Sequence, residues 1–388
     1  MEETRHLFII WEKSRFKEKE IIKDISKKFK VHAVFELKWD SCLFSKNLIR
    51  LYGNSLPDPK KKLLISGDKP FLVIFVSDPN PIIKNEKILE KIIEINLNIV
   101  KAKTDYRKLV GTEFSIHGTI SNKETNHDVK ILFGKSFEEM IMYYDNTKNE
   151  NYLKINQNTF LHSGPNNFAE FLKLLNGTIN YLILRNFETF PDRFVFENHN
   201  DIDILTDEIE NIPFVCFFYD EPFLKGSIPK IFINNLELPI DWKRPGDNFY
   251  DKKWYRDILD RKIFDLRGFY RPSDEDYFYT LFYHVVFHKK QLSDEYKIKI
   301  TNLSKNIKNL NFDPNILDNF DLSKKFLLSY LQKNGYKNPS SIMYRISNNE
   351  IIRLTKTSSY IIKKMGIMFF LKEFTSKLKR INDNIHPK

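Results

Sequence analysis

The stretch of residues 181–208 constrains the fold more than any other part of the chain. It begins with a short apolar run, residues 181–184, of the length of a buried strand, and it ends with Asp201-Ile202-Asp203 at the start of a second run. In an extended strand the carboxylates of Asp201 and Asp203 lie on one face, while Ile202 faces the core. Two carboxylates this close repel each other unless a cation lies between them, and Mg²⁺ prefers such oxygen ligands. The pattern predicts a metal site, with a solvated strand end as the alternative.

A third carboxylate, Asp241, follows in the segment 231–243, in which Leu236, Leu238 and Ile240 alternate with Glu237, Pro239 and Asp241. This arrangement resembles the nucleotidyltransferase fold, in which a D-h-D strand and an aspartate on a later strand hold two metal ions around a nucleoside triphosphate. The resemblance covers about residues 167–290. It implies that Asp201, Asp203 and Asp241 bind one or two Mg²⁺ (or Mn²⁺) ions and that Asp241 takes part in catalysis.

The turn before the acidic strand differs from that family in its residues. Arg185 and Asn186 stand where the family has the Gly-Ser turn that cradles phosphate. Versions with an arginine at this turn resemble a group of uncharacterised bacterial nucleotidyltransferases and, more remotely, the LicD and fukutin-related phosphotransferases. The resemblance implies that Arg185, Asn186 and Arg244 bind a substrate phosphate. For Arg244 the alternative is a turn with local ion pairs.

The N-terminal part, residues 5–134, alternates between strand and helix patterns. Apolar patterns typical of strands predict three strands, over residues 6–12, 31–39 and 70–78. Apolar residues at helical spacing predict three helices, over residues 17–29, 42–53 and 88–103. This order resembles nucleoside diphosphate kinase. The ferredoxin-like βαββαβ domain of that family ends with an Arg-x-x-x-Gly segment, a nucleophile loop that contains a histidine, and an amphipathic helix.

Three segments carry the resemblance to the kinase: Arg107 to Gly111 fits the first element, residues 115–121 stand at the nucleophile loop, and residues 124–133 fit the helix. The resemblance implies that His117 is the phosphorylated histidine and that Arg107 binds phosphate. The chemistry requires a neutral imidazole nitrogen that faces the phosphorus, with the ring oriented by a hydrogen bond from its other nitrogen. The alternative is that His117 caps a turn in a degenerate domain.

A polar stretch without apolar periodicity, residues 145–159, predicts a domain boundary. We expect four segments: a kinase-like domain over residues 1–134, a linker over residues 135–162, a nucleotidyltransferase-like domain over residues 163–290 and a helical C-terminal cap over residues 291–388. The predicted fold class is α+β, with a ferredoxin-like N-terminal domain, a central mixed sheet and a helical C-terminal region. In the central domain, the apolar run 213–220 predicts another buried strand.

Composition bounds the location and the partners of the chain. A net charge of +11 over 388 residues attracts polyanions, with a solvated lysine-rich surface as the alternative. Cys42 and Cys216 stand alone among apolar neighbours, which predicts small packed side chains in a reducing compartment. The N-terminus lacks the basic start of a signal peptide, and no apolar run approaches the roughly 18 residues that span a bilayer. We expect no transmembrane segment and a cytoplasmic location.

The leading hypothesis for the function is a Mg²⁺-dependent nucleotidyl- or polyol-phosphate transferase. The resemblance implies a nucleoside triphosphate or a CDP-linked polyol as the donor and a sugar or a surface glycan as the acceptor. Two other functions stay open: a non-catalytic protein that binds nucleic acid or another partner, and a phosphotransferase that depends on His117. Three converging carboxylates favour the enzyme, because a protein that only binds polyanions needs basic clefts.

Overall fold

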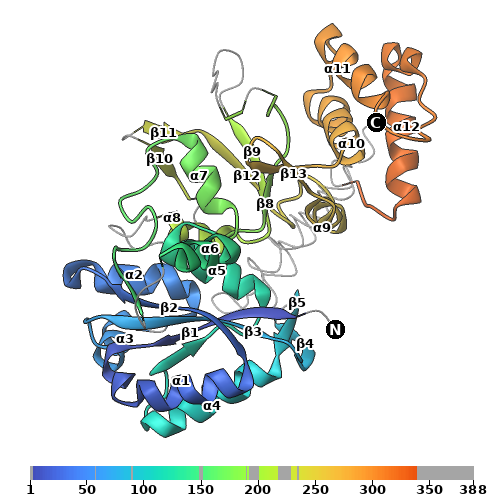
Figure 1. Cartoon of the computed structure of the whole chain (residues 1–388). Helices are drawn as coiled ribbons and strands as arrows, with labels where there is room; N and C mark the ends of the chain where they lie inside the picture. The colour runs from blue at the N-terminus through green and yellow to red at the C-terminus, as the bar shows by residue number, and fades with distance from the viewer. Residues whose placement is uncertain are drawn as a thin grey trace, which may run out of the picture. The chain divides into compact units, whose positions relative to one another are not determined.

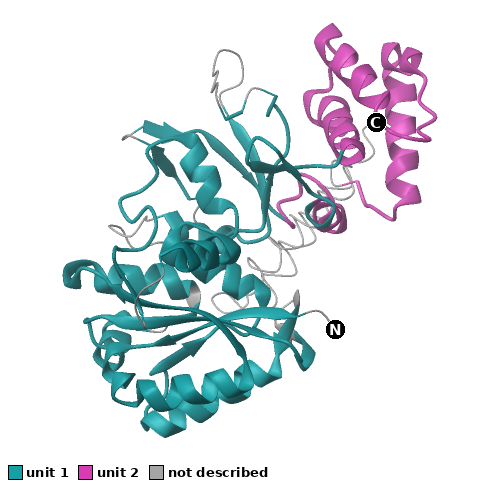
Figure 2. Ribbon diagram, viewed as in Figure 1, with its two compact units in different colours: residues 1–244, 259–273 teal, residues 245–258, 274–388 magenta. Residues whose placement is uncertain are grey.

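The computed structural model describes residues 3–56, 58–88, 91–147, 152–188, 190–191, 201–216, 229–233 and 236–338. The chain divides into two compact units, the first made of residues 1–244 and 259–273 and the second of residues 245–258 and 274–388 (Figure 2). Mixed sheets and helices build the first unit, and helices build the second. The predicted α+β class and the helical C-terminal region are confirmed, and the boundaries of the four predicted segments stay predictions.

A five-stranded sheet with the order β6-β1-β3-β2-β7 forms the N-terminal part of the first unit (Figure 1). Its strands are β1 (Thr4–Ile10), β2 (Lys30–Lys38), β3 (Phe71–Asp78), β6 (Ile116–Gly118) and β7 (Leu153–Asn156). Strand β1 is antiparallel to β3 and β6, whereas β2 is antiparallel to β3 and parallel to β7. Every residue of the central strand β3 is buried, as expected for a strand that is covered on both faces.

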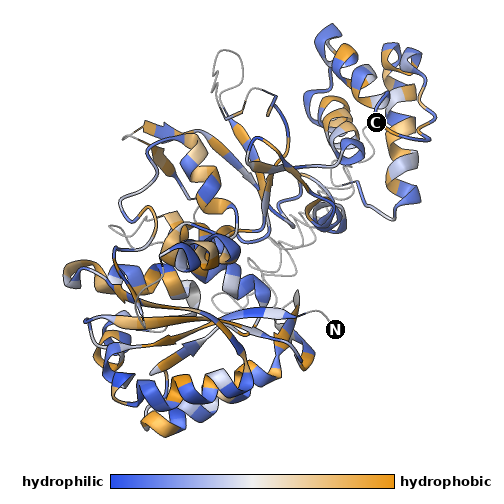
Figure 3. Ribbon diagram, viewed as in Figure 1, coloured by the Kyte–Doolittle hydropathy of each residue, from blue (hydrophilic) through white to orange (hydrophobic). Residues whose placement is uncertain are grey.

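Helices cover both faces of this sheet (Figure 1). On one face lie α1 (Glu18–Lys28) and α4 (Leu97–Val110), and on the other lie α2 (Phe44–Tyr52), α5 (Asn122–Phe133) and α6 (Phe137–Asn146). The first face buries a cluster that includes Phe8, Ile21, Ile25, Ile74 and Ile99. Hydrophobic residues run along the strands, while hydrophilic residues alternate with them on the helices (Figure 3). Two amphipathic layers thus share one sheet, because each helix turns its apolar stripe toward the strands.

The prediction of a helix over residues 88–103 is wrong in its first half. A hairpin of β4 (Ile83–Ile88) and β5 (Lys91–Asn96) precedes α4, which begins only at Leu97. The side chain of Asn96 accepts hydrogen bonds from the N–H groups of Asn98 and Ile99 and therefore caps the helix. The isoleucines before this cap fit the period of a strand as well as that of a helix, so the apolar pattern alone did not place the boundary.

The predicted linker, residues 135–162, contains regular structure. Ser136 and Glu139 form a reciprocal capping box at the start of α6. Strand β7 then adds to the edge of the sheet beside β2, where Phe35 pairs with Leu153. Tertiary pairing with β2, rather than any pattern within the segment, determines this short strand.

The second sheet of the first unit has the order β12-β9-β8. It consists of β8 (Tyr181–Ile183), β9 (Ile202–Thr206) and β12 (Ile240–Lys243), with α7 (Phe168–Leu175) before β8 and α8 (Ile212–Cys216) after β9. Strand β9 is antiparallel to β8 and parallel to β12. The strand predicted over residues 213–220 is wrong as far as the structure describes it, because Pro213 to Cys216 belong to α8, where a proline is tolerated in the first turn. Residues 217–220 lie outside the described part of the chain.

A proline divides the strand that was expected around Asp241. Leu236–Leu238 is β11, which pairs with β10 (Ile231–Ile233), whereas Asp241 belongs to β12 in the other sheet. Pro239 has no N–H to donate to a ladder, and its carbonyl accepts a hydrogen bond from Ile202 N–H at 2.7 Å. Leu236 of β11 is 73% exposed, so the alternation of the segment does not continue as one buried face.

A buried arginine joins three segments of the first unit. Arg50, on α2, is 1% exposed. Its guanidinium donates to Thr159 Oγ1 at 2.9 Å, to the Phe160 carbonyl at 2.5 Å and to the Val215 carbonyl at 2.8 Å. Burial lowers the pKa of Arg50 to about 9. The burial of this charged side chain thus depends on hydrogen-bond acceptors in segments that are far from it in the sequence.

The second unit is a group of helices held by aromatic side chains. These are α9 (Lys252–Asp260, whose last two residues belong to the first unit), α10 (Asp274–Tyr283), a π-helix (His284–Lys289), α11 (Asp294–Ser304) and α12 (Phe320–Lys333). The rings of Tyr279 and Tyr330 stack with centroids 3.4 Å apart, and those of Trp254 and Tyr336 stack at 5.5 Å. Residues 339–388 of the predicted cap lie outside the described part of the chain.

The remaining elements are short. They are α3 (Pro59–Ser66), the hairpin β13 (Ile263–Asp265) with β14 (Phe269–Arg271), and the 3₁₀ helices at Glu12–Lys17, Ser41–Leu43, Gly53–Ser55, Ile209–Asn211 and Pro314–Asp318. Among all the helices that the structure describes, none combines the length and the apolar character needed to cross a bilayer. Cys216 is buried as expected, but the expectation for Cys42 is wrong, since its side chain is exposed.

Candidate functional site

The structure brings the three predicted aspartates together. Strands β9 and β12 are parallel, and their register places Asp241 directly beside Asp203. Asp201 precedes Asp203 by two residues and lies on the same face of the sheet. Each of the three residues offers a carboxylate oxygen, and these oxygens all lie within 4.8 Å of one another. The proximity that alternation predicted for Asp201 and Asp203, and that the resemblance implied for Asp241, is present in the folded chain. We call Asp201, Asp203 and Asp241 the acidic cluster.

Asp203 already has a cationic partner within the protein. Arg185 Nε and Nη2 each donate to one of its two oxygens at 2.7 Å. Both side chains are buried, at 8% exposure for Arg185 and 3% for Asp203. Burial raises the pKa of Asp203 above its usual range, and the charge and hydrogen bonds of Arg185 oppose this effect. The bidentate pair fixes the carboxylate in one orientation.

The other two members of the acidic cluster differ in their surroundings. Lys243 Nζ donates to Asp241 Oδ2 at 2.5 Å, and Lys243 is itself buried. Asp201 is exposed, and among the residues that the structure describes no group donates a hydrogen bond to its carboxylate. One carboxylate of the acidic cluster is thus held by arginine, one by lysine, and one is open to solvent.

This donor set suits one divalent ion better than two. Asp201 offers two oxygens, Asp241 offers its second oxygen, and Asp203 retains lone pairs beside its bonds to Arg185. Hard oxygen donors of this kind are what Mg²⁺ and Mn²⁺ bind. The three carboxylates and two cationic side chains sum to a single negative charge, so one Mg²⁺ makes the group positive and ready for an anionic substrate.

The residues predicted to bind phosphate lie in three different situations. Arg185 points to Asp203 and positions it. Asn186 takes the left-handed conformation with φ 58°, which a glycine adopts easily and an asparagine tolerates. Arg244 is exposed directly after β12 and close in sequence to Asp241.

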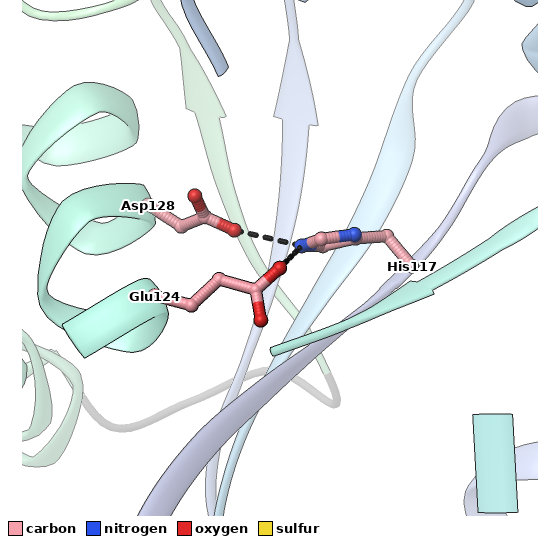
Figure 4. Close-up of side chains that lie close together, drawn as sticks. All are labelled: His117, Glu124 and Asp128. Atoms are coloured by element: carbon pink, nitrogen blue, oxygen red, sulfur yellow. Dashed lines mark hydrogen bonds and ion pairs between the residues drawn. The ribbon is translucent and has the colours of Figure 1, made fainter. Parts of the chain in front are cut away.

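His117 lies on β6, where the sequence predicted a loop. It pairs with Ile9 of β1, and its Nε2 lies 2.7 Å from Asp128 Oδ2 and 3.9 Å from Glu124 Oε1 (Figure 4). Within the described part of the chain, no hydrogen-bond partner faces its Nδ1. Gly118 permits close packing here, because a Cβ at this position would lie 2.9 Å from a ring carbon of Phe8. The imidazole therefore has one oriented nitrogen and one open nitrogen.

Asp128 is the strongest partner of His117. It is 2% exposed, and its other oxygen, Oδ1, lies 3.0 Å from His127 Nδ1. Burial alone raises the pKa of this carboxyl, but the hydrogen bonds with His117 and His127 prevail and hold the pKa of Asp128 below its usual range. An ionised Asp128 fixes the orientation of the His117 ring.

Three basic side chains surround the segment that carries His117. Lys62 Nζ donates to the Phe114 carbonyl at 2.5 Å, Lys103 Nζ to the Gly118 carbonyl at 3.0 Å, and Arg107 Nε to the Ile116 carbonyl at 2.9 Å. Burial lowers the pKa of all three, and that of Lys62 to about 7. The predicted neighbour Arg107 is thus beside the histidine strand and helps to hold it.

Sequence reasoning missed four residues of these two groups. Lys243 follows Asp241 by two residues, so strand alternation would have placed it on the same face. Asp128 follows Glu124 by four residues on a helix, the spacing at which side chains are neighbours. Lys62 and Lys103 had no such signal, because each reads as one more lysine in a lysine-rich chain.

No protein-family model matches this chain, and a search of curated proteins finds no match.

Proposed function

We propose that the chain is a Mg²⁺-dependent phosphotransferase that works through Asp201, Asp203 and Asp241. The observation that carries this proposal is the parallel pairing of β9 with β12, which sets Asp241 beside Asp203 and gathers three carboxylate oxygens within 4.8 Å. The donor is a nucleotide or a nucleotide-linked polyol phosphate, and the acceptor is a sugar or glycan hydroxyl. The net charge of +11 agrees with an anionic donor.

The order of elements supports the two finer parts of the fold proposal. In the second sheet, α7 and β8 lead into the Arg185–Asn186 turn, and the D-h-D strand β9 and the later strand β12 follow, as the resemblance to nucleotidyltransferases implies. In the N-terminal sheet, β1, α1, β2, β3, α4 and β6 occur in this order, with α2 and α3 between β2 and β3 and the β4–β5 hairpin before α4. The antiparallel strand order is β6-β1-β3-β2. We propose a nucleotidyltransferase-like fold for the first and a ferredoxin-like fold for the second.

Each residue of the acidic cluster and its partners has a separate role in the proposal. When bound, Mg²⁺ neutralises phosphate charge and lowers the pKa of the attacking hydroxyl. Asp201 and Asp241 provide the accessible oxygens, and Asp203 completes the set. Arg185 and Lys243 act as positioning residues, since each holds one oxygen-donor group in place through a hydrogen bond of 2.5–2.7 Å.

The first prediction concerns metal binding by Asp201. Asp201→Asn removes the solvent-exposed carboxylate without leaving a buried cation unpaired, so we expect Mg²⁺ or Mn²⁺ affinity to fall at least about tenfold while folding is retained. Isothermal titration with Mn²⁺ measures the change. Asp207→Asn is a matched control, since Asp207 lies beyond the same strand and outside the acidic cluster. Equal Mn²⁺ affinity in wild type and Asp201→Asn would remove the metal site.

The decisive test of the function is turnover with a labelled donor. Purified protein is incubated with Mg²⁺ and each of the four nucleoside triphosphates, labelled in turn at the α- and γ-phosphate, and the products are resolved. We expect a donor to be consumed only when the acidic cluster is intact. If no triphosphate or CDP-linked polyol reacts with any sugar acceptor, and the chain instead binds nucleic acid without turnover, the non-catalytic alternative holds.

The geometry of His117 favours a second candidate, a phosphotransferase that uses this histidine. The observation behind it is the 2.7 Å contact between Nε2 and Asp128, which orients the ring and directs Nδ1 away from the carboxylates (Figure 4). However, the segment between Gly111 and His117 is short, which leaves few backbone N–H groups to bind a triphosphate. Lys62, Lys103 and Arg107 each donate a hydrogen bond to a backbone carbonyl of that region. We therefore expect little phosphate exchange between ATP and GDP. Robust exchange that is lost in His117→Ala would contradict this expectation.

A further inference from the structure

A cluster of His117, Glu124 and Asp128 lies outside the acidic cluster and shares no residue with it (Figure 4). Each of the three residues offers one ligand atom, and these atoms lie within 4.8 Å of one another. His117 Nε2 faces both Asp128 Oδ2 and Glu124 Oε1. Glu124 and Asp128 are one helical turn apart on α5, so both side chains reach the same side of the helix, and β6 supplies the histidine. We propose that this cluster is a binding site for a divalent transition-metal ion such as Zn²⁺, distinct from the proposed Mg²⁺ site.

The distances between the three ligand atoms bracket those of a tetrahedral site. With bonds to zinc of 2.0–2.2 Å, two ligand atoms in a tetrahedron lie about 3.3 Å apart. In the structure Nε2 is 2.7 Å from the Asp128 oxygen and 3.9 Å from the Glu124 oxygen. Shifts of about half an ångström in each side chain bring both distances to the required value. The ion then replaces the proton that Nε2 and Asp128 share.

Hydrogen bonds behind the ligand atoms hold both carboxylates. Glu124 Oε2 accepts from the N–H of Ile120 at 2.7 Å, which leaves Oε1 facing His117. Asp128 Oδ1 lies 3.0 Å from His127 Nδ1, which leaves Oδ2 facing the same point. In each carboxylate one oxygen is therefore held by a neighbouring group and the other oxygen faces the cluster. Metal-binding carboxylates are commonly oriented in this way by hydrogen bonds to groups that do not touch the metal.

The kind of donor and the local charge select the ion. An imidazole nitrogen suits Zn²⁺, Co²⁺ and similar ions, whereas Mg²⁺ prefers oxygen alone. Lys62, Lys103 and Arg107, the basic side chains beside this segment, each donate to a backbone carbonyl rather than to either carboxylate. His117 and Asp128 are buried, so protein atoms shield the ion from water on their side. Glu124 is partly exposed, so an ion can reach the cluster from solvent past this side chain.

Cobalt titration in excess Mg²⁺ tests the proposal, because Mg²⁺ fills the acidic cluster and leaves the nitrogen-containing site to Co²⁺. We expect wild type to bind one Co²⁺ per chain, with the visible absorption of cobalt bound by nitrogen and with displacement by Zn²⁺. Asp128→Asn and Glu124→Gln are each expected to lower Co²⁺ affinity at least about tenfold. His162→Asn, a change of an exposed histidine outside the cluster, is expected to leave it unchanged.

Folding of each variant is checked by circular dichroism and by its melting temperature without metal. If Asp128→Asn does not fold, Glu124→Gln decides, since its side chain is 34% exposed and tolerates the change. A second readout is thermal: Zn²⁺ is expected to raise the melting temperature of wild type and of His162→Asn, but not of Glu124→Gln. Absence of Co²⁺ binding in excess Mg²⁺, or equal affinity in wild type and Glu124→Gln, overturns the proposal.

Discussion

Arg185→Ala is expected to destabilise the sheet that carries the acidic cluster by about 3 kcal/mol or more, because it leaves a buried charge without its partner. Asp203 is 3% exposed, and Arg185 contributes both hydrogen bonds that the structure shows for its oxygens. The change is measured as amide hydrogen exchange of β9 and β12, which should be faster by at least about a hundredfold. Local exchange is the appropriate measurement, since a chain with two units need not unfold in one step.

The destabilisation by Arg185→Ala has a defined pH dependence. Burial raises the pKa of Asp203 in the folded protein, and removing Arg185 raises it further. A carboxyl whose pKa is raised by folding costs stability where it is ionised, above that pKa, and this cost disappears as the pH falls below the unfolded value. We therefore expect the difference between wild type and Arg185→Ala to be largest at neutral pH and to shrink in acid.

Lys230→Ala provides the matched control for Arg185→Ala. It also breaks an ion pair, between Lys230 and Glu237 at 2.9 Å, but both of these side chains are exposed. Exposed pairs contribute little, so exchange in β9 and β12 should change by less than about fivefold. If Arg185→Ala exchanges no faster than Lys230→Ala, Asp203 does not depend on its arginine.

Asp241→Asn is expected to lower turnover by about two orders of magnitude or more, equivalent to roughly 3 kcal/mol of lost transition-state stabilisation. In the proposed site Asp241 would hold the metal from the strand beside Asp203, and Lys243 Nζ donates to its carboxylate at 2.5 Å. A carboxylate that positions the proposed Mg²⁺ would act on the attacking hydroxyl, whose pKa the ion lowers, more than on the bound nucleotide. Donor affinity should therefore change only severalfold, which separate measurements of kcat and of the dissociation constant of the donor can show.

Glu237→Gln is the control for Asp241→Asn. The sequence places Glu237 on the same strand as Asp241, but the structure assigns it to β11 in another sheet, paired with Lys230. Its replacement should leave turnover within about twofold of wild type, as for a surface change away from the site. Equal turnover in wild type and Asp241→Asn would instead exclude Asp241 from the chemistry.

Much of the sheet framework follows from the sequence, because strands covered on both faces leave a clear signal. Strand β3 is apolar along nearly its whole length, and α7 carries both an apolar stripe and an asparagine cap. The pattern failed where one run fits two periods, as in the isoleucines of β5, and where pairing with a distant strand decides, as for β7. Such segments take their structure from neighbours that the local sequence does not contain.

For the candidate site, the sequence predicted which carboxylates meet but not what else meets them. Strand alternation sufficed to bring Asp201 and Asp203 to one face, whereas the register that sets Asp241 beside Asp203 depends on the break at Pro239. The resemblance directed Arg185 toward a substrate phosphate, and in the structure it binds Asp203 instead. A guanidinium suits either anion equally well, so only the folded geometry distinguishes the two.

The hydrogen bonds of Arg50 limit when α2 can pack into its final position while the chain is being synthesised. Its guanidinium is part of α2, but its acceptors, Thr159, Phe160 and Val215, leave the ribosome more than a hundred residues later. Until then a charged group that the finished protein buries has to remain hydrated, which keeps α2 from closing over the sheet. A nascent chain that ends at Gly134 is therefore expected to be collapsed but incomplete, and protease resistance should appear only once Val215 has emerged.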